Sequence, residues 1–244
     1  GQLDNALQSY EKALTIKPDY AEVHYNLGVT LQELDQLEAA VKSYEKAITI
    51  KPDYADAYIN LGITLKNLGQ LDAAVKSYEK AIAINPDYAE AHNNLGNTLD
   101  DLGQLDAAVK SYENALAIKP DFAEAHNNLG NTLMNLDQLN EAVKCFKQAL
   151  AIKPDYAEAH NNLGNTLMNL DQLEASIKSF EKALAINPRY AEAHNNLGNS
   201  LEELGRLKEA EASYKQAIAF KQDFAEAHNN LSVLLREVGR LEEA

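Results

Sequence analysis

The sequence predicts an all-α protein, an α-solenoid in which pairs of antiparallel helices stack one after another. The first observation is a repeat: the segment Ala-Glu-Ala-His-Asn-Asn-Leu-Gly-Asn-Thr-Leu occurs at residues 89–99, 123–133 and 157–167, each copy 34 residues after the last. A fixed period of this length is typical of stacked supersecondary units. The second observation is a composition rich in Ala, Leu, Glu and Lys, which are strong helix formers. The third is the lack of an alternating strand pattern of useful length.

Within each unit, the apolar residues predict two amphipathic helices. In residues 21–54, the first helix carries a stripe of residues at spacings of three and four from His24 to Leu34. The second helix carries a similar stripe from Leu37 to Ile50. One unit is therefore a helical hairpin, and its stripes must be buried against the neighbouring units.

The ends of the helices carry their own signals. Asp35 stands where most other units have Gly, and both residues suit the left-handed turn that ends a helix. Pro52 ends the second helix. Asp53 is expected to cap the following first helix, with Asp56 completing an acidic capping box.

Small and charged residues indicate which faces are buried. Gly28 lies in the middle of a first helix, where Gly costs ~1 kcal/mol relative to Ala. A close helix crossing would justify that cost, and the ring of Tyr44 is expected to fill the space towards the next unit. On the second helices, acids stand four residues before lysines, as in Glu174 and Lys178, which predicts ion pairs on a solvated outer face.

The spaced pattern resembles the tetratricopeptide repeat (TPR) family. The residues that carry the resemblance in the first complete unit are His24, Leu27, Gly28, Leu31, Ala40, Tyr44, Ala47 and Pro52. Three positions depart from the family pattern: His, or Tyr58 in one unit, replaces a common Trp, Gln222 replaces Pro, and Ser232 replaces Gly. The resemblance implies a right-handed superhelix whose first helices line the concave wall.

The resemblance covers the whole chain, so residues 1–244 are expected to form a single TPR array. Residues 1–20 are expected to form a lone second helix, and residues 225–244 a partial repeat. The complete repeats are 21–54, 55–88, 89–122, 123–156, 157–190 and 191–224.

Composition and charge exclude several classes of partner. The formal net charge of −15 argues against nucleic acid and anionic membranes as partners, and it permits basic peptides. No apolar run approaches the roughly 20 residues that cross a bilayer. Cys145 is the only cysteine, so no internal disulfide can form. No secretory signal is evident, which favours a cytoplasmic location without identifying the compartment.

Asparagines predict where a partner binds. The exposed face of the first helices is expected to consist of the second, fifth, sixth, ninth, twelfth and thirteenth residues of each unit. On this face Asn recurs although it is a poor helix former. Its amide donates and accepts, so a column of Asn could hold an extended peptide by its backbone. The predicted peptide-binding residues are Asn26, Asn60, Asn94, Asn97, Asn128, Asn131, Asn162, Asn165, Asn196, Asn199 and Asn230.

The predicted function is therefore a peptide- or protein-binding scaffold, and three alternatives stay open. The asparagines could be copies that merely face water. The chain could be a module that assembles with itself. The Asn column and the phrase Ala-His-Asn-Asn-Leu-Gly-Asn are also similar to the TPR arm of O-GlcNAc transferases and their bacterial relatives. That resemblance implies a third alternative, a substrate-recruiting arm of a larger glycosyltransferase.

The residues do not predict an enzyme, a metal site or a cofactor. The six histidines share one register, so neighbours are on the order of 10 Å apart in packed helices. Zinc ligands lie ~2 Å from one ion, so these histidines are expected to serve packing. No Ser-His-acid set or phosphate-binding loop occurs.

The two ends of the array predict self-association. A lone second helix at one end and a lone first helix at the other leave complementary apolar faces. Head-to-tail stacking of copies would cover them through heterologous contacts. The predicted contact residues are Leu3, Leu7, Tyr10, Leu14, Leu231, Leu234, Leu235 and Val238.

Overall fold

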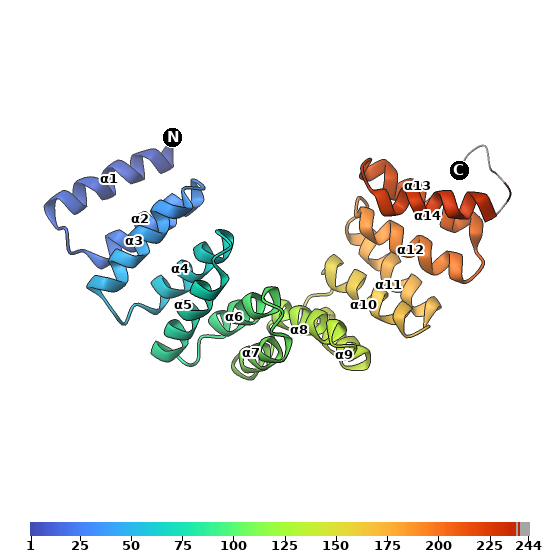
Figure 1. Cartoon of the computed structure of the whole chain (residues 1–244), viewed down its shortest axis with the longest axis horizontal. Coiled ribbons are helices and arrows are strands. Elements are labelled where there is room, and N and C mark those ends of the chain that lie inside the picture. Colours follow the sequence, from blue (N-terminus) through green and yellow to red (C-terminus); the bar gives the residue numbers. More distant parts are fainter. Residues whose placement is uncertain (238, 240–244) are drawn as a thin grey trace. The chain divides into compact units, whose positions relative to one another are not determined.

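The protein is all helical. The computed structural model describes residues 1–237 and 239, and these residues form fourteen α-helices and no strand (Figure 1). The helices group into two compact units, one of residues 1–120 and the other beginning at Asp121. The first unit holds α1 (Gln2–Ile16), α2 (Ala21–Glu33), α3 (Leu37–Ile50), α4 (Ala55–Asn67), α5 (Leu71–Ile84), α6 (Ala89–Asp101) and α7 (Leu105–Ile118). The second holds α8 (Ala123–Asn135), α9 (Leu139–Ile152), α10 (Ala157–Asn169), α11 (Leu173–Ile186), α12 (Ala191–Glu203), α13 (Leu207–Phe220) and α14 (Ala225–Glu237).

Each even-numbered helix from α2 to α12 pairs with the helix that follows it, and these antiparallel pairs are the predicted hairpins. Within each unit, a hairpin also packs against the next one, as α3 does on α4 and α11 on α12. The first helices of consecutive repeats contact one another, for example α8 with α10 and α10 with α12. Among the described residues, consecutive second helices make no such contact. The first helices therefore lie closer together, on the inner side of each stack.

The turn inside each hairpin is left-handed, as predicted. Asp35, Asp137 and Asp171 have φ of 58°, 60° and 57°, and Gly103 has φ of 71° at the same register. The N–H of Gln36 donates to the carbonyl oxygen of Leu31 at 2.8 Å, which satisfies a carbonyl at the end of α2. Gly and Asp thus perform the same role in different repeats.

The core of each hairpin is a ring that lies against a glycine. A Cβ atom added to Gly28 would lie 2.6 Å from Cε1 of Tyr44, so the two helices approach as closely as predicted. Tyr44 is 0% exposed, and Ala40 and Ala47 beside it are also fully buried. The ring also fills space towards the next unit, as predicted, since Tyr44 shares a core cluster with Ile59 and Leu61 of the next repeat. The missing side chain of Gly28 opens a slot inside the same repeat, and the ring occupies that slot.

The acidic capping boxes do not form. Tyr20 and Tyr54 occupy the N-cap positions of α2 and α4 without a side-chain capping bond, so the preceding Asp lies one residue too early. The acid inside the helix instead pairs with the lysine at the end of its own repeat's second helix. These pairs are Glu22–Lys51 at 4.0 Å, Glu90–Lys119 at 3.2 Å, Glu124–Lys153 at 3.7 Å and Glu192–Lys221 at 3.0 Å.

No helix within the described part of the chain combines the length and the apolar character that a membrane span requires.

Candidate functional site

A ladder of side-chain amides joins consecutive first helices. The Asn at the sixth position of a repeat donates from Nδ2 to the side chain at the fifth position of the preceding repeat. Asn162 donates in this way to Oδ1 of Asn127 at 3.1 Å, and Asn196 to Oδ1 of Asn161 at 3.1 Å. In the first unit, Asn60 donates to the hydroxyl of Tyr25 at 2.9 Å. The asparagines thus have a structural role that the sequence analysis did not assign.

The fifth-position asparagines of α6, α8, α10 and α12 are buried, although the sequence analysis placed them on the exposed face. Asn127 and Asn195 are both 0% exposed. Their own amides donate to the acid at the second position of the next repeat, Asn127 to Oε1 of Glu158 at 3.3 Å and Asn195 to Oε1 of Glu226 at 3.0 Å. A buried amide needs such partners, because an unpaired one costs ~1–3 kcal/mol. The junctions of α8 with α10 and of α12 with α14 are therefore chains of three polar groups.

The sixth-position asparagines remain accessible at the rim of the ladder. Asn26 is exposed, whereas the other members of the column are half-buried. A primary amide has two N–H groups and an acceptor oxygen, so one rung uses only part of its capacity. Asn94 forms no rung to the preceding repeat, because Ile59 there carries no polar atom. Asn230 makes two bonds, to Oδ1 of Asn195 at 3.1 Å and to Oδ1 of Asn199 at 3.0 Å.

The ninth-position asparagines fall into two classes. Asn97 accepts a hydrogen bond of 2.8 Å from the hydroxyl of Tyr112. Asn131 and Asn165 stand opposite Phe146 and Phe180, which have no hydroxyl to donate. Their half-buried side chains have no hydrogen-bond partner among the described residues. The Tyr-to-Phe alternation is visible in the sequence, but its effect on the facing Asn requires the packed hairpin.

The surface beside Asn131 and Asn165 carries no charge. Met134 and Met168 lie one turn further along α8 and α10, both half-buried. The hydroxyl of Thr166 contacts Sδ of Met134 at 3.1 Å and ties the two helices together. Methionine is a flexible apolar side chain that adapts to different partners.

The next repeat is acidic at the equivalent place. Tyr214 donates hydrogen bonds to Oδ1 of Asn199 at 2.9 Å and to Oε2 of Glu202 at 2.5 Å. Burial, and then the bond to Glu202, raise the pKa of the Tyr214 phenol, so the hydroxyl stays a donor. A cavity of about 400 Å³ lies here, lined in part by Glu203 and Val233. The first-helix surface of the second unit thus changes from uncharged to acidic.

Two of the predicted self-association residues are buried within the chain. Leu234 and Leu235 are only 1% and 3% exposed, and Leu234 packs in a core cluster with Leu201 and Tyr214. The preceding hairpin covers these two leucines, and the self-association itself stays a prediction. Val238 lies outside the described residues. The remaining members are half-buried: Leu3, Leu7, Tyr10, Leu14 and Leu231.

The histidines hold the loops between repeats. The Nε2 atom of a histidine lies 2.9 to 3.0 Å from the backbone carbonyl oxygen of the residue six positions earlier, as in His24 with Pro18 and His160 with Pro154. His228 makes the same bond to Gln222, because only the backbone carbonyl is needed. No group of three His, Cys, Asp or Glu side chains suited to a metal ion occurs in the described ranges.

Family profiles match most of the chain. A profile described as "TPR repeat" matches residues 1–35, 31–69, 65–103, 99–137 and 130–171. A second, described as "Tetratricopeptide repeat", matches residues 155–223. No curated protein matches the sequence significantly.

Solved structures of helical repeat proteins share the fold. A chain of the APC/C hetero-tetramer Cut9-Hcn1 superposes with a TM-score of 0.78 at 18% identity, over 96% of this chain and 46% of that one. This chain therefore spans about half the length of that relative. YrrB, described as a TPR protein with an unusual peptide-binding site, has a TM-score of 0.64 at 24% identity, over 78% of this chain and 97% of that one. MamA has a TM-score of 0.62 at 26% identity, over 68% and 97% respectively.

Proposed function

The chain belongs to the tetratricopeptide repeat family, and from this premise we propose that it is a scaffold that binds an extended segment of a partner protein. TPR arrays are typically non-catalytic modules for protein interaction. The proposed binding surface consists of Asn128, Asn131, Asn162 and Asn165 with Met134 and Met168, all on α8 and α10. We call it the asparagine surface.

The observation that carries the proposal is the state of Asn131 and Asn165. Both amides are half-buried on the inner side of the stack and have no hydrogen-bond partner among the described residues. A backbone peptide group offers one donor and one acceptor, which a primary amide can satisfy together. Two such amides in consecutive repeats would hold an extended chain in register, with the ladder fixing the helices that present them.

The magnitudes favour a modest affinity. Each hydrogen bond contributes a net ~0.5–1.5 kcal/mol, so several rungs must act together. A dissociation constant on the order of 1 μM corresponds to about 8 kcal/mol. Apolar contact with Met134 and Met168 would supply part of this free energy. The acids Glu202 and Glu203 further along favour a partner segment that carries a basic residue next to an uncharged stretch.

A peptide array followed by fluorescence anisotropy tests the proposal. Peptides that bind the wild-type chain should bind the variant Asn131→Ala/Asn165→Ala at least tenfold more weakly. Asn97→Ala is the matched control, because that amide lies at the same register but is occupied by Tyr112. Unchanged affinity in the double variant, with its helical circular dichroism intact, would contradict the proposal.

A second variant tests the mechanism without removing the amides. Phe146→Tyr/Phe180→Tyr places a hydroxyl opposite each free carbonyl, as in the repeat that contains Asn97 and Tyr112. The new hydroxyls should donate to Oδ1 of Asn131 and Asn165 and so weaken peptide binding, without lowering the free energy of unfolding. Tight binding by this variant would exclude the Asn oxygens as peptide acceptors.

A further inference from the structure

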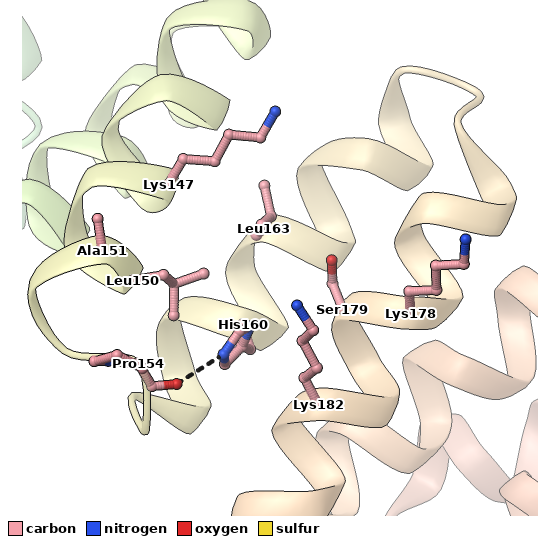
Figure 2. Close-up of a pocket in the computed structure, with 9 residues that line it drawn as sticks. All are labelled: Lys147, Leu150, Ala151, Pro154, His160, Leu163, Lys178, Ser179 and Lys182. Atoms are coloured by element: carbon pink, nitrogen blue, oxygen red, sulfur yellow. Dashed lines mark hydrogen bonds between the residues drawn. The ribbon is translucent and has the colours of Figure 1, made fainter.

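A cavity of about 500 Å³ lies between the second helices of two neighbouring repeats, and α10, which carries part of the asparagine surface, also contributes to its lining (Figure 2). Its walls come from α9 and α11, and α10 supplies part of its floor. The lining residues are Lys147, Leu150, Ala151, Pro154, His160, Leu163, Lys178, Ser179 and Lys182. Three exposed lysines and a buried imidazole therefore border one hollow, in a protein whose net charge is −15.

The three lysines are not neutralised by the protein. Lys147, Lys178 and Lys182 form no ion pair with any described residue. The pair predicted between Lys178 and Glu174 is absent, so that expectation was wrong for this repeat. The three positive charges repel one another, and no carboxylate of the described residues balances them.

Sequence differences concentrate the charge at this one junction. Where Lys147 stands, four other repeats carry Glu, namely Glu45, Glu79, Glu113 and Glu181, and the repeat of residues 191–224 carries Lys215, which pairs with Glu211 at 2.6 Å. Where Lys182 stands, three repeats carry an uncharged residue, namely Asn114, Gln148 and Gln216. A change from Glu to Lys shifts the local charge by two units, so this junction is basic while its counterparts are not.

His160 supplies a second, independent observation. Its side chain is only 7% exposed, and Nε2 bonds to the carbonyl oxygen of Pro154 at 3.0 Å. Nδ1 is buried and has no hydrogen-bond partner among the described residues. In Figure 2, Lys182 extends towards His160 and Ser179, whereas Lys147 and Lys178 reach outward from the two helices. Burial, with the charge of Lys182 as a smaller cause, lowers the pKa of His160, so its ring is held neutral.

We propose that this cavity binds a small organic phosphate monoester. The phosphate would be held by the three ammonium groups, which provide charge-assisted hydrogen bonds. A phosphate dianion beside His160 would favour the imidazolium, so that Nδ1–H becomes a fourth donor. Leu150, Ala151 and Leu163 offer apolar contact for the organic part. The volume falls in the range of small-molecule sites, about 300–1,000 Å³, and exceeds what a bare anion fills.

Isothermal titration calorimetry with phenyl phosphate tests the proposal on the full chain. The wild type should bind phenyl phosphate at least tenfold more tightly than inorganic phosphate, because only the ester uses the apolar wall. Lys147→Glu, which introduces the residue of four other repeats, should abolish binding, and Lys182→Gln should weaken it at least tenfold. Lys80→Gln is the matched control at the register of Lys182 and should leave binding unchanged.

Three results would overturn the inference. The first is that millimolar phenyl phosphate produces no heat of binding. The second is equal affinity for phenyl phosphate and inorganic phosphate. The third is an equal loss of phenyl phosphate affinity in Lys182→Gln and Lys80→Gln. A phosphotyrosine peptide that bound more tightly than phenyl phosphate would also overturn it, by identifying a protein ligand. Nitrogen-15 NMR of His160 supplies a separate readout, since its Nδ1 resonance should shift on addition of phenyl phosphate and stay unmoved with phenol.

Discussion

Tyr214 donates a hydrogen bond of 2.9 Å to Oδ1 of Asn199, fifteen residues earlier in the same hairpin. Tyr112 makes the same bond to Asn97 at 2.8 Å. Phe146 occupies the same slot without the hydroxyl: a Cβ on Gly130 would lie 2.7 Å from its Cε1, compared with 2.6 Å for Gly96 and Tyr112. The ring position is therefore constant, and only the bond to the facing Asn differs between repeats.

This comparison predicts that Phe146→Tyr stabilises the chain. The added hydroxyl should reach Oδ1 of Asn131 and increase the free energy of unfolding by about 0.5–1.5 kcal/mol. Tyr112→Phe should have the opposite effect, since it removes the bond to Asn97. Urea denaturation followed by circular dichroism measures both. A loss of stability in Phe146→Tyr would mean that the slot cannot accommodate the hydroxyl.

The amide ladder predicts that Asn127→Ala is strongly destabilising. The change leaves the amide of Asn162 without its acceptor and Glu158 without its donor, at a cost of about 1–3 kcal/mol. Asn229→Ala is the control at the same register, because Asn229 is exposed. The comparison uses thermal unfolding. A similar loss of thermal stability in both variants would show that the hydrogen bonds of the amide ladder do not contribute to stability.

The hairpin slot predicts that Gly96→Ala lowers stability although Ala favours helix. The new Cβ would lie 2.6 Å from Cε1 of Tyr112, and overpacking of this kind costs about 1–3 kcal/mol. The gain in helix propensity, ~1 kcal/mol, offsets only part of that cost. Ser232→Ala tests the same register in α14, where a larger residue is native, and it should change the unfolding free energy little.

Tyrosines predict a loss of stability in alkali. The hydrogen bond to Asp56, at 2.7 Å, and then burial raise the pKa of Tyr88 to about 12, and burial raises the pKa of Tyr156 to about 12. An unfolded tyrosine has a pKa of about 10. The unfolded chain therefore releases these protons first, so the stabilisation is complete below pH 10 and is lost as the pH rises to about 12.

Urea unfolding at a series of pH values between about 10 and 12 measures this loss. Ultraviolet absorbance of the phenolate follows the ionisation itself. In Tyr88→Phe the decline of unfolding free energy with pH should be shallower than in the wild type. An identical slope would show that Tyr88 does not titrate differently in the folded state.

The sequence predicted the parts of the fold that depend on local spacing. The helix pairs follow from stripes such as that from His24 to Leu34, and the left-handed turns follow from Gly and Asp at one register. The caps were wrong because each helix begins one residue later than the acidic box requires, a difference that spacing does not resolve. The contact of the Tyr44 ring with Gly28 of its own repeat was not predicted, because periodicity does not show which side chain enters the space left by a glycine.

The candidate sites were less accessible to sequence reasoning. The column of sixth-position Asn was found from recurrence alone, but its bond to the fifth residue of the preceding repeat joins residues 35 positions apart, as Asn162 and Asn127. The basic cavity was missed for the same reason. Lys147 and Lys182 come from different repeats, and only packed helices show that they face one space.

The amide ladder also bears on how such an array can change length during evolution. The repeats that begin at residues 89, 123, 157 and 191 all carry Asn at both the fifth and the sixth position. Each can therefore serve as donor to the one before it and as acceptor for the one after it. Within the second unit, unequal recombination that removes or inserts one whole block of 34 residues recreates the same junction at the splice. The two earlier repeats, with Tyr25 and Ile59 at the fifth position, lack this interchangeability.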